Sequence, residues 1–126
     1  MIGHLIDCDG PAFGDRIAVI LDGVDEIPPH DIHVAIATQS FADQPAVDLI
    51  GELRASRRRA GDYLRTLDPI ALGATSSFPD GRLFSACDFV HEWPFHDQDH
   101  LQQILDATKR AYLVGMGPAM RDGLLD

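Results

Sequence analysis

The sequence predicts an α+β fold: a two-layer sandwich in which two helices cover one face of a mainly antiparallel five-stranded sheet, in the order β-β-β-α-β-β-α. Three observations predict it. Short runs of β-branched residues come in two groups, tight turns separate the runs within each group, and an amphipathic helical pattern follows each group. With 45% hydrophobic residues, the chain can form one core. We expect a single domain over residues 1–118 and a flexible tail over 119–126.

The first group contains three predicted strands, over residues 2–7, 16–21 and 32–38. Each is short and rich in isoleucine or valine, as strands buried on both faces are. The connection over residues 10–15 is short and contains turn formers, so the first two strands are predicted to form a hairpin. Pro28 and Pro29 indicate a loop before the third strand, because proline cannot donate a ladder hydrogen bond.

The first helix is predicted over residues 45–67. Pro45 suits a helix start, and Asp43 before it is a candidate cap. Apolar residues then recur at helical spacing, with arginines on the outer face. Asp68 and Pro69 end the pattern.

The second group has predicted strands over residues 70–76 and 82–93, joined by a turn at residues 78–81. Pro94 ends the longer strand, and Asp97 or Asp99 caps a second helix. This helix has an apolar stripe, and its residues are Leu101, Ile104, Leu105, Thr108, Ala111 and Tyr112.

The net charge of −10, from 20 acidic and 10 basic residues, disfavours nucleic-acid binding because such a surface repels phosphates. No apolar run has the roughly 20 residues of a membrane helix, so we expect no membrane partner. No signal peptide is evident. The two cysteines, Cys8 and Cys87, are too few for a disulfide scaffold, which favours a cytoplasmic protein.

The acidic residues concentrate in the first 53 positions, where Arg16 is the only arginine or lysine. This distribution favours an acidic module that binds and masks a basic protein partner, because carboxylates steer a cationic surface into contact. The predicted partner-binding residues are Asp7, Asp9, Asp22, Asp25, Glu26, Asp31 and Trp93. Trp93 would serve as an anchor if exposed. A homodimer is compatible with this function.

Two classes of protein fit this hypothesis. The order of strands and helices resembles the core of type III secretion chaperones, although their usual N-terminal helix is absent here. Small acidic immunity proteins, which mask toxin nucleases, share the size and charge.

Residues 4–14, HLIDCDGPAFG, resemble the first motif of the haloacid dehalogenase phosphatases, in which one aspartate is the nucleophile and the other a general acid. The resemblance implies a parallel sheet, whereas here a second strand follows within a few residues. The later motifs are missing, since the only lysine is Lys109, inside the last predicted helix. Because Asp-Gly favours hairpin turns, Asp9 and Gly10 are interpreted as a turn, as are Asp22 and Gly23.

The alternative hypothesis is a small metal-dependent enzyme or metal-binding protein that uses the segment HEWPFHDQDH, residues 91–100. The candidate ligands are His91, His96 and His100. His96 and His100 are four residues apart, so on a helix they share a face, as paired metal ligands must. Imidazole and carboxylate ligands suit a divalent ion such as zinc. His30 and His33 are further candidates if the third strand lies nearby. The main hypothesis needs no cofactor and assigns no catalytic residue.

Two other residues are candidates for a chemical role. Asp88 shares a strand face with apolar neighbours, which favours a structural partner such as an arginine. Cys8, at a strand end, is expected to be the more exposed of the two cysteines, but it has no basic neighbour in sequence to activate it.

Overall fold

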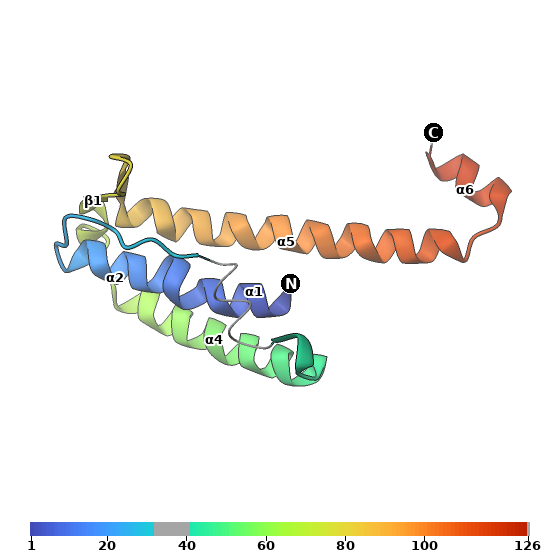
Figure 1. Cartoon of the computed structure of the whole chain (residues 1–126), viewed down its shortest axis with the longest axis horizontal. Helices are drawn as coiled ribbons and strands as arrows, with labels where there is room; N and C mark the ends of the chain where they lie inside the picture. The colour runs from blue at the N-terminus through green and yellow to red at the C-terminus, as the bar shows by residue number, and fades with distance from the viewer. Residues whose placement is uncertain (32–40, 126) are drawn as a thin grey trace. The chain divides into compact units, whose positions relative to one another are not determined.

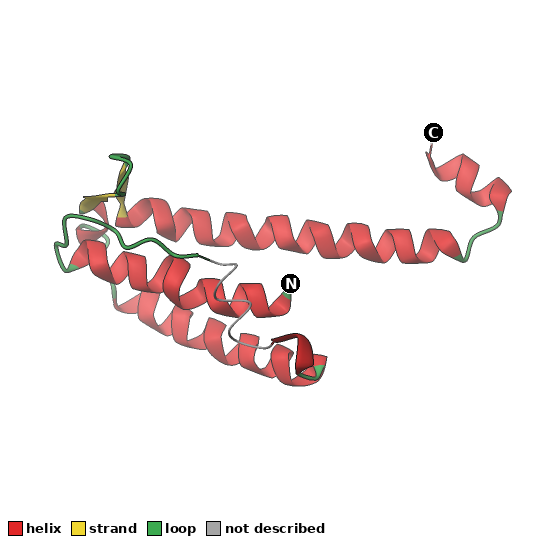
Figure 2. Cartoon of the chain, in the orientation of Figure 1, coloured by secondary structure: helices red, strands yellow, loops and turns green. Residues whose placement is uncertain are grey.

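The computed structural model describes residues 1–31 and 41–125 and is mostly helical, with 72% of residues in helices. Among these residues the sheet consists of two short antiparallel strands (Figure 2). The predicted α+β sandwich with a five-stranded sheet is therefore wrong. By compactness the chain divides into a first unit, Met1–Trp93, and a second unit, Pro94–Asp126, which are described separately.

The first unit begins with one continuous helical run. Its parts are α1 (Ile2–Asp7), a π-helical segment η1 (Cys8–Gly14) and α2 (Asp15–Leu21) (Figure 1). The two predicted strands here and the predicted turn at Asp9 and Gly10 are wrong. Pro11 lies inside the π-helical segment, a type of distortion that is common at functional sites.

The apolar run of α2 was misassigned because a short buried run fits a strand and a buried helix equally well. A helix is distinguished from a strand here only when Phe13, which precedes the run, is considered together with the run. Phe13, Ile17 and Ile20 are all buried, and their spacing of four and three residues is that of a helix face. The third predicted strand, residues 32–38, lies outside the described residues.

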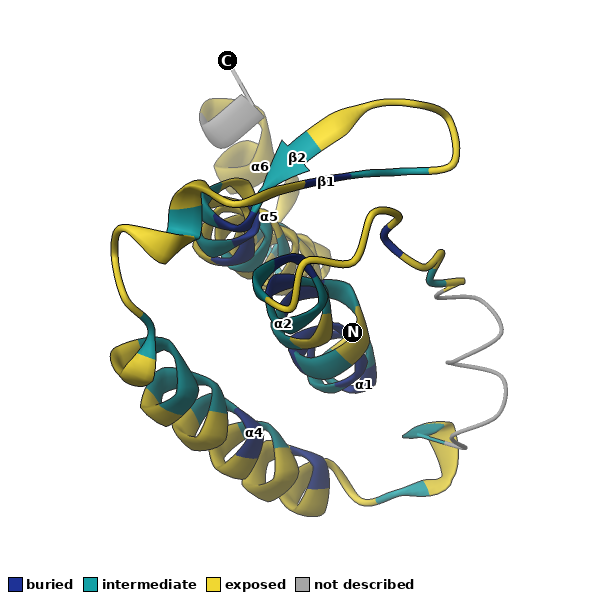
Figure 3. Cartoon of the chain, turned by 90° about the vertical axis from the view of Figure 1, so that its left-hand side faces the viewer, coloured by how far each residue is buried: buried dark blue, intermediate teal, exposed yellow. Residues whose placement is uncertain are grey.

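After a short 3₁₀ turn, η2 (Phe41–Asp43), the long helix α4 (Ala46–Thr66) agrees with the helix predicted over residues 45–67. Pro45 is the residue before its first turn. Helices α1 and α4 lie side by side (Figure 1). Most of α4 is exposed, with buried positions on one face only (Figure 3).

The contact between the start of α1 and the 3₁₀ turn leaves no space for a side chain at Gly3. A Cβ atom at Gly3 would overlap the Cβ and ring carbons of Phe41. We expect Gly3→Ala to destabilise the first unit. The overlap includes the Phe41 Cβ atom, so rotation of the ring alone cannot relieve it and the Phe41 backbone would have to shift. Gly51→Ala is the control, since nothing lies within 4 Å of its added Cβ in α4. There we expect a gain of about 0.5–1 kcal/mol, measured by chemical denaturation. Equal effects of the two substitutions would contradict this packing.

A second short turn, η3 (Ala71–Gly73), leads to the hairpin of β1 (Thr75–Ser77) and β2 (Leu83–Ser85). Ser76 pairs with Phe84 in antiparallel register. The predicted turn over residues 78–81 is confirmed, because the Gly81 amide donates to the Phe78 carbonyl at 2.8 Å and Gly81 has a positive φ of 84°. The predicted strands were too long at the ends that lie away from this turn. The strand predicted over residues 70–76 begins only at Thr75, and the strand predicted over residues 82–93 already ends at Ser85.

Residues predicted to continue the last strand instead begin the long helix α5 (Ala86–Val114). The Ser85 amide and hydroxyl donate to the Asp88 carboxylate at 2.7 and 2.8 Å, and the Asp88 amide donates back to the Ser85 hydroxyl at 3.1 Å. This reciprocal capping box stabilises a helix start. The backbone and hydroxyl hydrogen bonds from Ser85 lower the pKa of Asp88. Asp88 thus has a structural partner, but it is Ser85 and not an arginine.

The core of the first unit joins these elements. Ile17, Ile20, Ile27 and Phe89 are its most deeply buried large side chains. Phe13 stacks on Trp93, with ring centroids 5.2 Å apart. In Figure 3, α1 and α2 are buried or half-buried along almost their whole length, and Asp15 is the one exposed residue within these two helices. The core therefore combines the N-terminal helical run with the first turns of α5.

The second unit contains the rest of α5 and the helix α6 (Pro118–Leu125), which lies where a tail was predicted. Pro94 is inside α5 and did not end an element. The helical pattern after residue 97 is confirmed. Its apolar stripe is largely exposed, with Leu101 58%, Leu105 56% and Tyr112 70% accessible.

Candidate functional site

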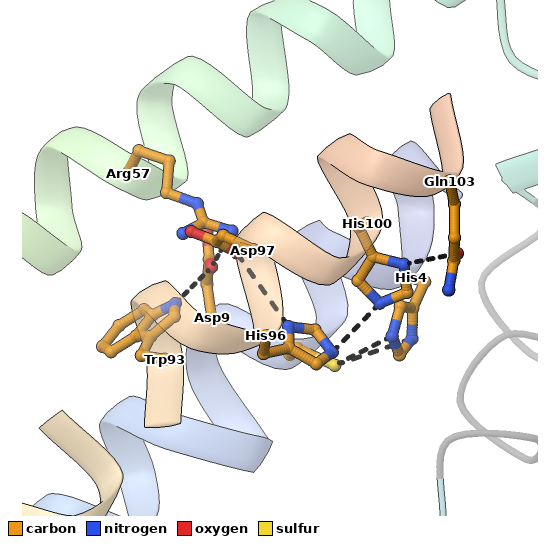
Figure 4. Close-up of polar contacts among 9 residues, drawn as sticks. His4, Asp9, Arg57, Trp93, His96, Asp97, His100 and Gln103 are labelled. Atoms are coloured by element: carbon orange, nitrogen blue, oxygen red, sulfur yellow. Dashed lines mark hydrogen bonds and ion pairs between the residues drawn. The ribbon is translucent and has the colours of Figure 1, made fainter. Parts of the chain in front are cut away.

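Asp9 is the centre of a buried polar cluster in the first unit (Figure 4). The π-helical segment places it inside the unit, and only 5% of the residue is exposed. Its Oδ1 accepts a hydrogen bond from the Trp93 indole Nε1 at 3.1 Å and an ion pair from the Arg57 Nη2 at 3.1 Å. The Arg57 guanidinium also lies 5.9 Å from the Trp93 ring centroid. The cluster therefore connects η1, α4 and α5 through one carboxylate.

Asp7 is buried as well, and it anchors the loop that follows α2. The His30 Nε2 donates to the Asp7 Oδ2 at 2.9 Å, across 23 residues of sequence. His30 is thus held by a carboxylate of its own unit. The further candidate His33 lies outside the described residues.

Cys8 is buried and is not the exposed cysteine that the sequence predicted. Burial raises the pKa of its thiol to about 12, and the carboxylates of Asp7 and Asp9 add to the effect. The thiol is therefore protonated near neutral pH and is a poor nucleophile. Its Sγ lies 3.6 and 3.8 Å from the two ring nitrogens of His4, four residues earlier. His4 has no counterpart among the predicted site residues, although the spacing of four residues was visible in the sequence.

His96 and His100 form a close pair in the second unit, as the sequence predicted from their spacing. Both lie on α5, and their Nε2 atoms are 3.1 Å apart (Figure 4). The Gln103 Oε1 lies 3.0 Å from the His100 Nδ1. Because that oxygen can only accept, the His100 Nδ1 is the donor in this contact. The third predicted ligand, His91, is exposed on α5 in the first unit.

The predicted partner-binding residues do not form one outer surface. Asp7, Asp9 and Trp93 are buried, and each is held by a side-chain hydrogen bond inside the first unit. The remaining four, Asp22, Asp25, Glu26 and Asp31, are exposed. Asp7 and Asp9 were expected on an outer surface, and they are buried because the segments predicted as a strand and a turn are helical. A basic protein partner and a homodimer remain predictions.

A cleft lies between the N-terminal helical run and α4. Its volume is about 450 Å³, and Trp93 also contributes to its lining. The residues of α4 that line it are Ser56, Arg59, Ala60 and Tyr63, which share one helix face. Asp7 and Asp9 line the opposite wall. The cleft is therefore next to the buried polar cluster.

A family model described as the DinB superfamily matches residues 1–104. The chain belongs to the DinB superfamily. No curated protein and no solved structure matches it. The DinB superfamily is helical and typically binds a metal ion. Membership therefore overturns the prediction of an acidic immunity or chaperone module, and it favours the alternative of a metal-binding protein.

The His96 and His100 pair fits a metal ion. Two imidazole nitrogens that each lie 2.0–2.1 Å from one tetrahedral zinc ion are roughly 3.3 Å apart. The observed separation of 3.1 Å is close to that value. The hydrogen bond that the His100 Nδ1 donates to Gln103 orients His100 as a ligating histidine is usually oriented in metal sites. The separation of the two nitrogens is therefore compatible with two ligands to one ion.

Among the described residues, no helix is both long enough and apolar enough to cross a membrane.

Proposed function

We propose that this DinB-superfamily protein binds a divalent metal ion through His96 and His100, with zinc as the first candidate. The observation that carries the proposal is the 3.1 Å separation of the two Nε2 atoms, together with membership of a superfamily that typically binds metal. When bound, such an ion can polarise a substrate oxygen. The predicted cytoplasmic location is retained as part of the proposal.

The residues of the chain prepare the pair for this role. The Gln103 Oε1 accepts from the His100 Nδ1, an arrangement that leaves the His100 Nε2 to face a cation. Asp97 lies near the other histidine, with its Oδ1 3.9 Å from the His96 Nδ1. Because metal-bound histidines commonly contact a carboxylate or carbonyl with the second nitrogen, Gln103 and Asp97 are the expected supporting residues.

Metal binding is tested by calorimetric titration of the chelator-treated protein with zinc and with manganese. We expect binding of one ion per chain and its loss in His96→Ala and in His100→Ala, since each removes a ligand. Gln103→Leu is expected to weaken binding by about 10–100-fold, because it removes support but no ligand. His91→Ala is the matched control, an exposed histidine of the same helix outside the pair.

Absence of binding heat, or equal binding by His96→Ala and the His91→Ala control, would refute the proposal. Circular dichroism of each variant separates loss of a ligand from loss of fold.

A further inference from the structure

The cleft of the first unit has the size of a small-molecule site. Its volume of about 450 Å³ lies within the range of roughly 300–1,000 Å³ that is typical of ligand pockets. One wall is formed by the N-terminal helical run and the other by α4. Ile6, Ala18, Ala60 and the Trp93 indole give the walls an apolar lining. A ligand with an apolar body therefore fits the interior.

Two of the carboxylates that line the cleft are already compensated. Asp7 accepts from His30 at 2.9 Å, and Asp9 is paired with Arg57 at 3.1 Å and with the Trp93 indole. These contacts hold the first unit together. The chemistry of a ligand must therefore be decided by the other charged residues of the cleft.

Those residues are Asp15 and Arg59, which are of opposite sign and lie on opposite walls. Asp15 begins α2, Arg59 is on α4, and both are exposed at the cleft. Within residues 1–31 and 41–125, no hydrogen bond or ion pair engages either side chain, with each other or with a third residue. The cleft thus presents one anionic and one cationic group to solvent.

The negative charge of Asp15 acts on a side chain that lines the cleft. Tyr63 lines the α4 wall, and its pKa is raised by burial first and then by the negative charges of Asp22 and Asp15. A positive group on the ligand is therefore favoured at the side of the cleft where Asp15 lies.

We propose that this cleft binds a small zwitterion, an α-amino acid with an apolar side chain, whose ammonium group pairs with Asp15 and whose carboxylate pairs with Arg59. A simple amine would make no charge-assisted contact with Arg59, and a simple carboxylic acid would make none with Asp15. Only a ligand with both charges satisfies the two walls at once, while its side chain contacts Ala18, Ala60 and Trp93. This inference stands on the first unit alone and is independent of the metal proposal.

The experiment compares three probes of one shape: leucine, isopentylamine, which lacks the carboxylate, and 4-methylpentanoate, which lacks the ammonium group. Binding to the full chain is measured by calorimetry and by amide chemical shifts. We expect leucine to bind about tenfold more tightly than either fragment, because each charge-assisted contact contributes to affinity. Asp15→Asn should weaken leucine and isopentylamine but leave 4-methylpentanoate unchanged. Arg59→Gln should weaken leucine and 4-methylpentanoate but leave isopentylamine unchanged.

Two substitutions of the same chemistry outside the cleft serve as controls, Asp25→Asn in the loop after α2 and Arg58→Gln beside Arg59 on α4. Both are expected to bind leucine as the parent protein does. The proposal is overturned if leucine shows no binding at millimolar concentration. It is also overturned if isopentylamine binds as tightly as leucine and Arg59→Gln has no effect, since the cleft would then be a site for cations. Because all four positions are exposed, the variants keep the fold, and thermal unfolding verifies this.

Discussion

Replacing Phe89 with alanine is expected to lower the unfolding free energy of the protein by about 3–5 kcal/mol. Phe89 is 1% exposed and packs against Phe84 and Phe78, with ring centroids 5.8 and 6.3 Å away. The Arg16 guanidinium lies 5.7 Å from its ring centroid. The substitution removes all these contacts and leaves a cavity where α5 meets the hairpin. The measurement is urea denaturation followed by circular dichroism.

Phe95→Ala is the matched control, because it deletes the same side chain from the same helix. Phe95 is 66% exposed, so we expect a change of less than about 0.5 kcal/mol. Similar losses from the two substitutions would mean that the first turns of α5 do not form the core described above.

Helix α4 was predictable because its signals are local. Pro45 suits the start of a helix, apolar residues follow at helical spacing, and Asp68 with Pro69 ends the pattern. The turn at residues 78–81 was predictable for the same reason, since Gly81 supplies the positive φ that closes it. In both cases neighbouring residues decide the structure without reference to the rest of the chain.

The two largest errors concern segments whose structure depends on burial. Residues 16–21 form a short apolar run, and composition alone cannot distinguish a buried strand from a buried helix turn. Residues 82–93 contain a local signal for the start of a helix. Ser85 and Asp88 are three residues apart, the spacing of a capping box, and this marks the start of α5. Asp88 was instead interpreted as an unusual residue within a strand.

The candidate sites divide in the same way. The pairing of His96 with His100 followed from their spacing, because residues four apart share a helix face. The contact of Asp9 with Trp93 joins residues 84 positions apart in sequence, and its geometry depends on how the helices pack. No pattern in one sequence predicts such a contact. The cleft, which two separate helical segments form, was beyond sequence analysis for the same reason.

Arg57→Ala is expected to lower the unfolding free energy by about 2–3 kcal/mol, the second large effect. The Asp9 side chain is 3% exposed, so the substitution removes a cationic partner from a buried carboxylate. Loss of one partner from a fully buried pair costs more, about 3–5 kcal/mol. Because 30% of the Arg57 side chain is exposed, solvent screening reduces the loss.

Arg58→Ala is the control, since Arg58 is the next residue of α4 and is exposed. Arg57→Lys should be intermediate, because an ammonium group retains the charge but not the planar guanidinium beside the Trp93 ring. Urea denaturation of the three variants ranks the contributions. If Arg57→Ala falls within 0.5 kcal/mol of Arg58→Ala, roughly the scatter expected at surface positions, the Asp9 carboxylate does not depend on this ion pair. The expected ranking would instead show that the ion pair between Arg57 and Asp9 stabilises the packing of α4 on the N-terminal helical run. These two segments form the walls of the cleft, so the same ion pair would stabilise the cleft.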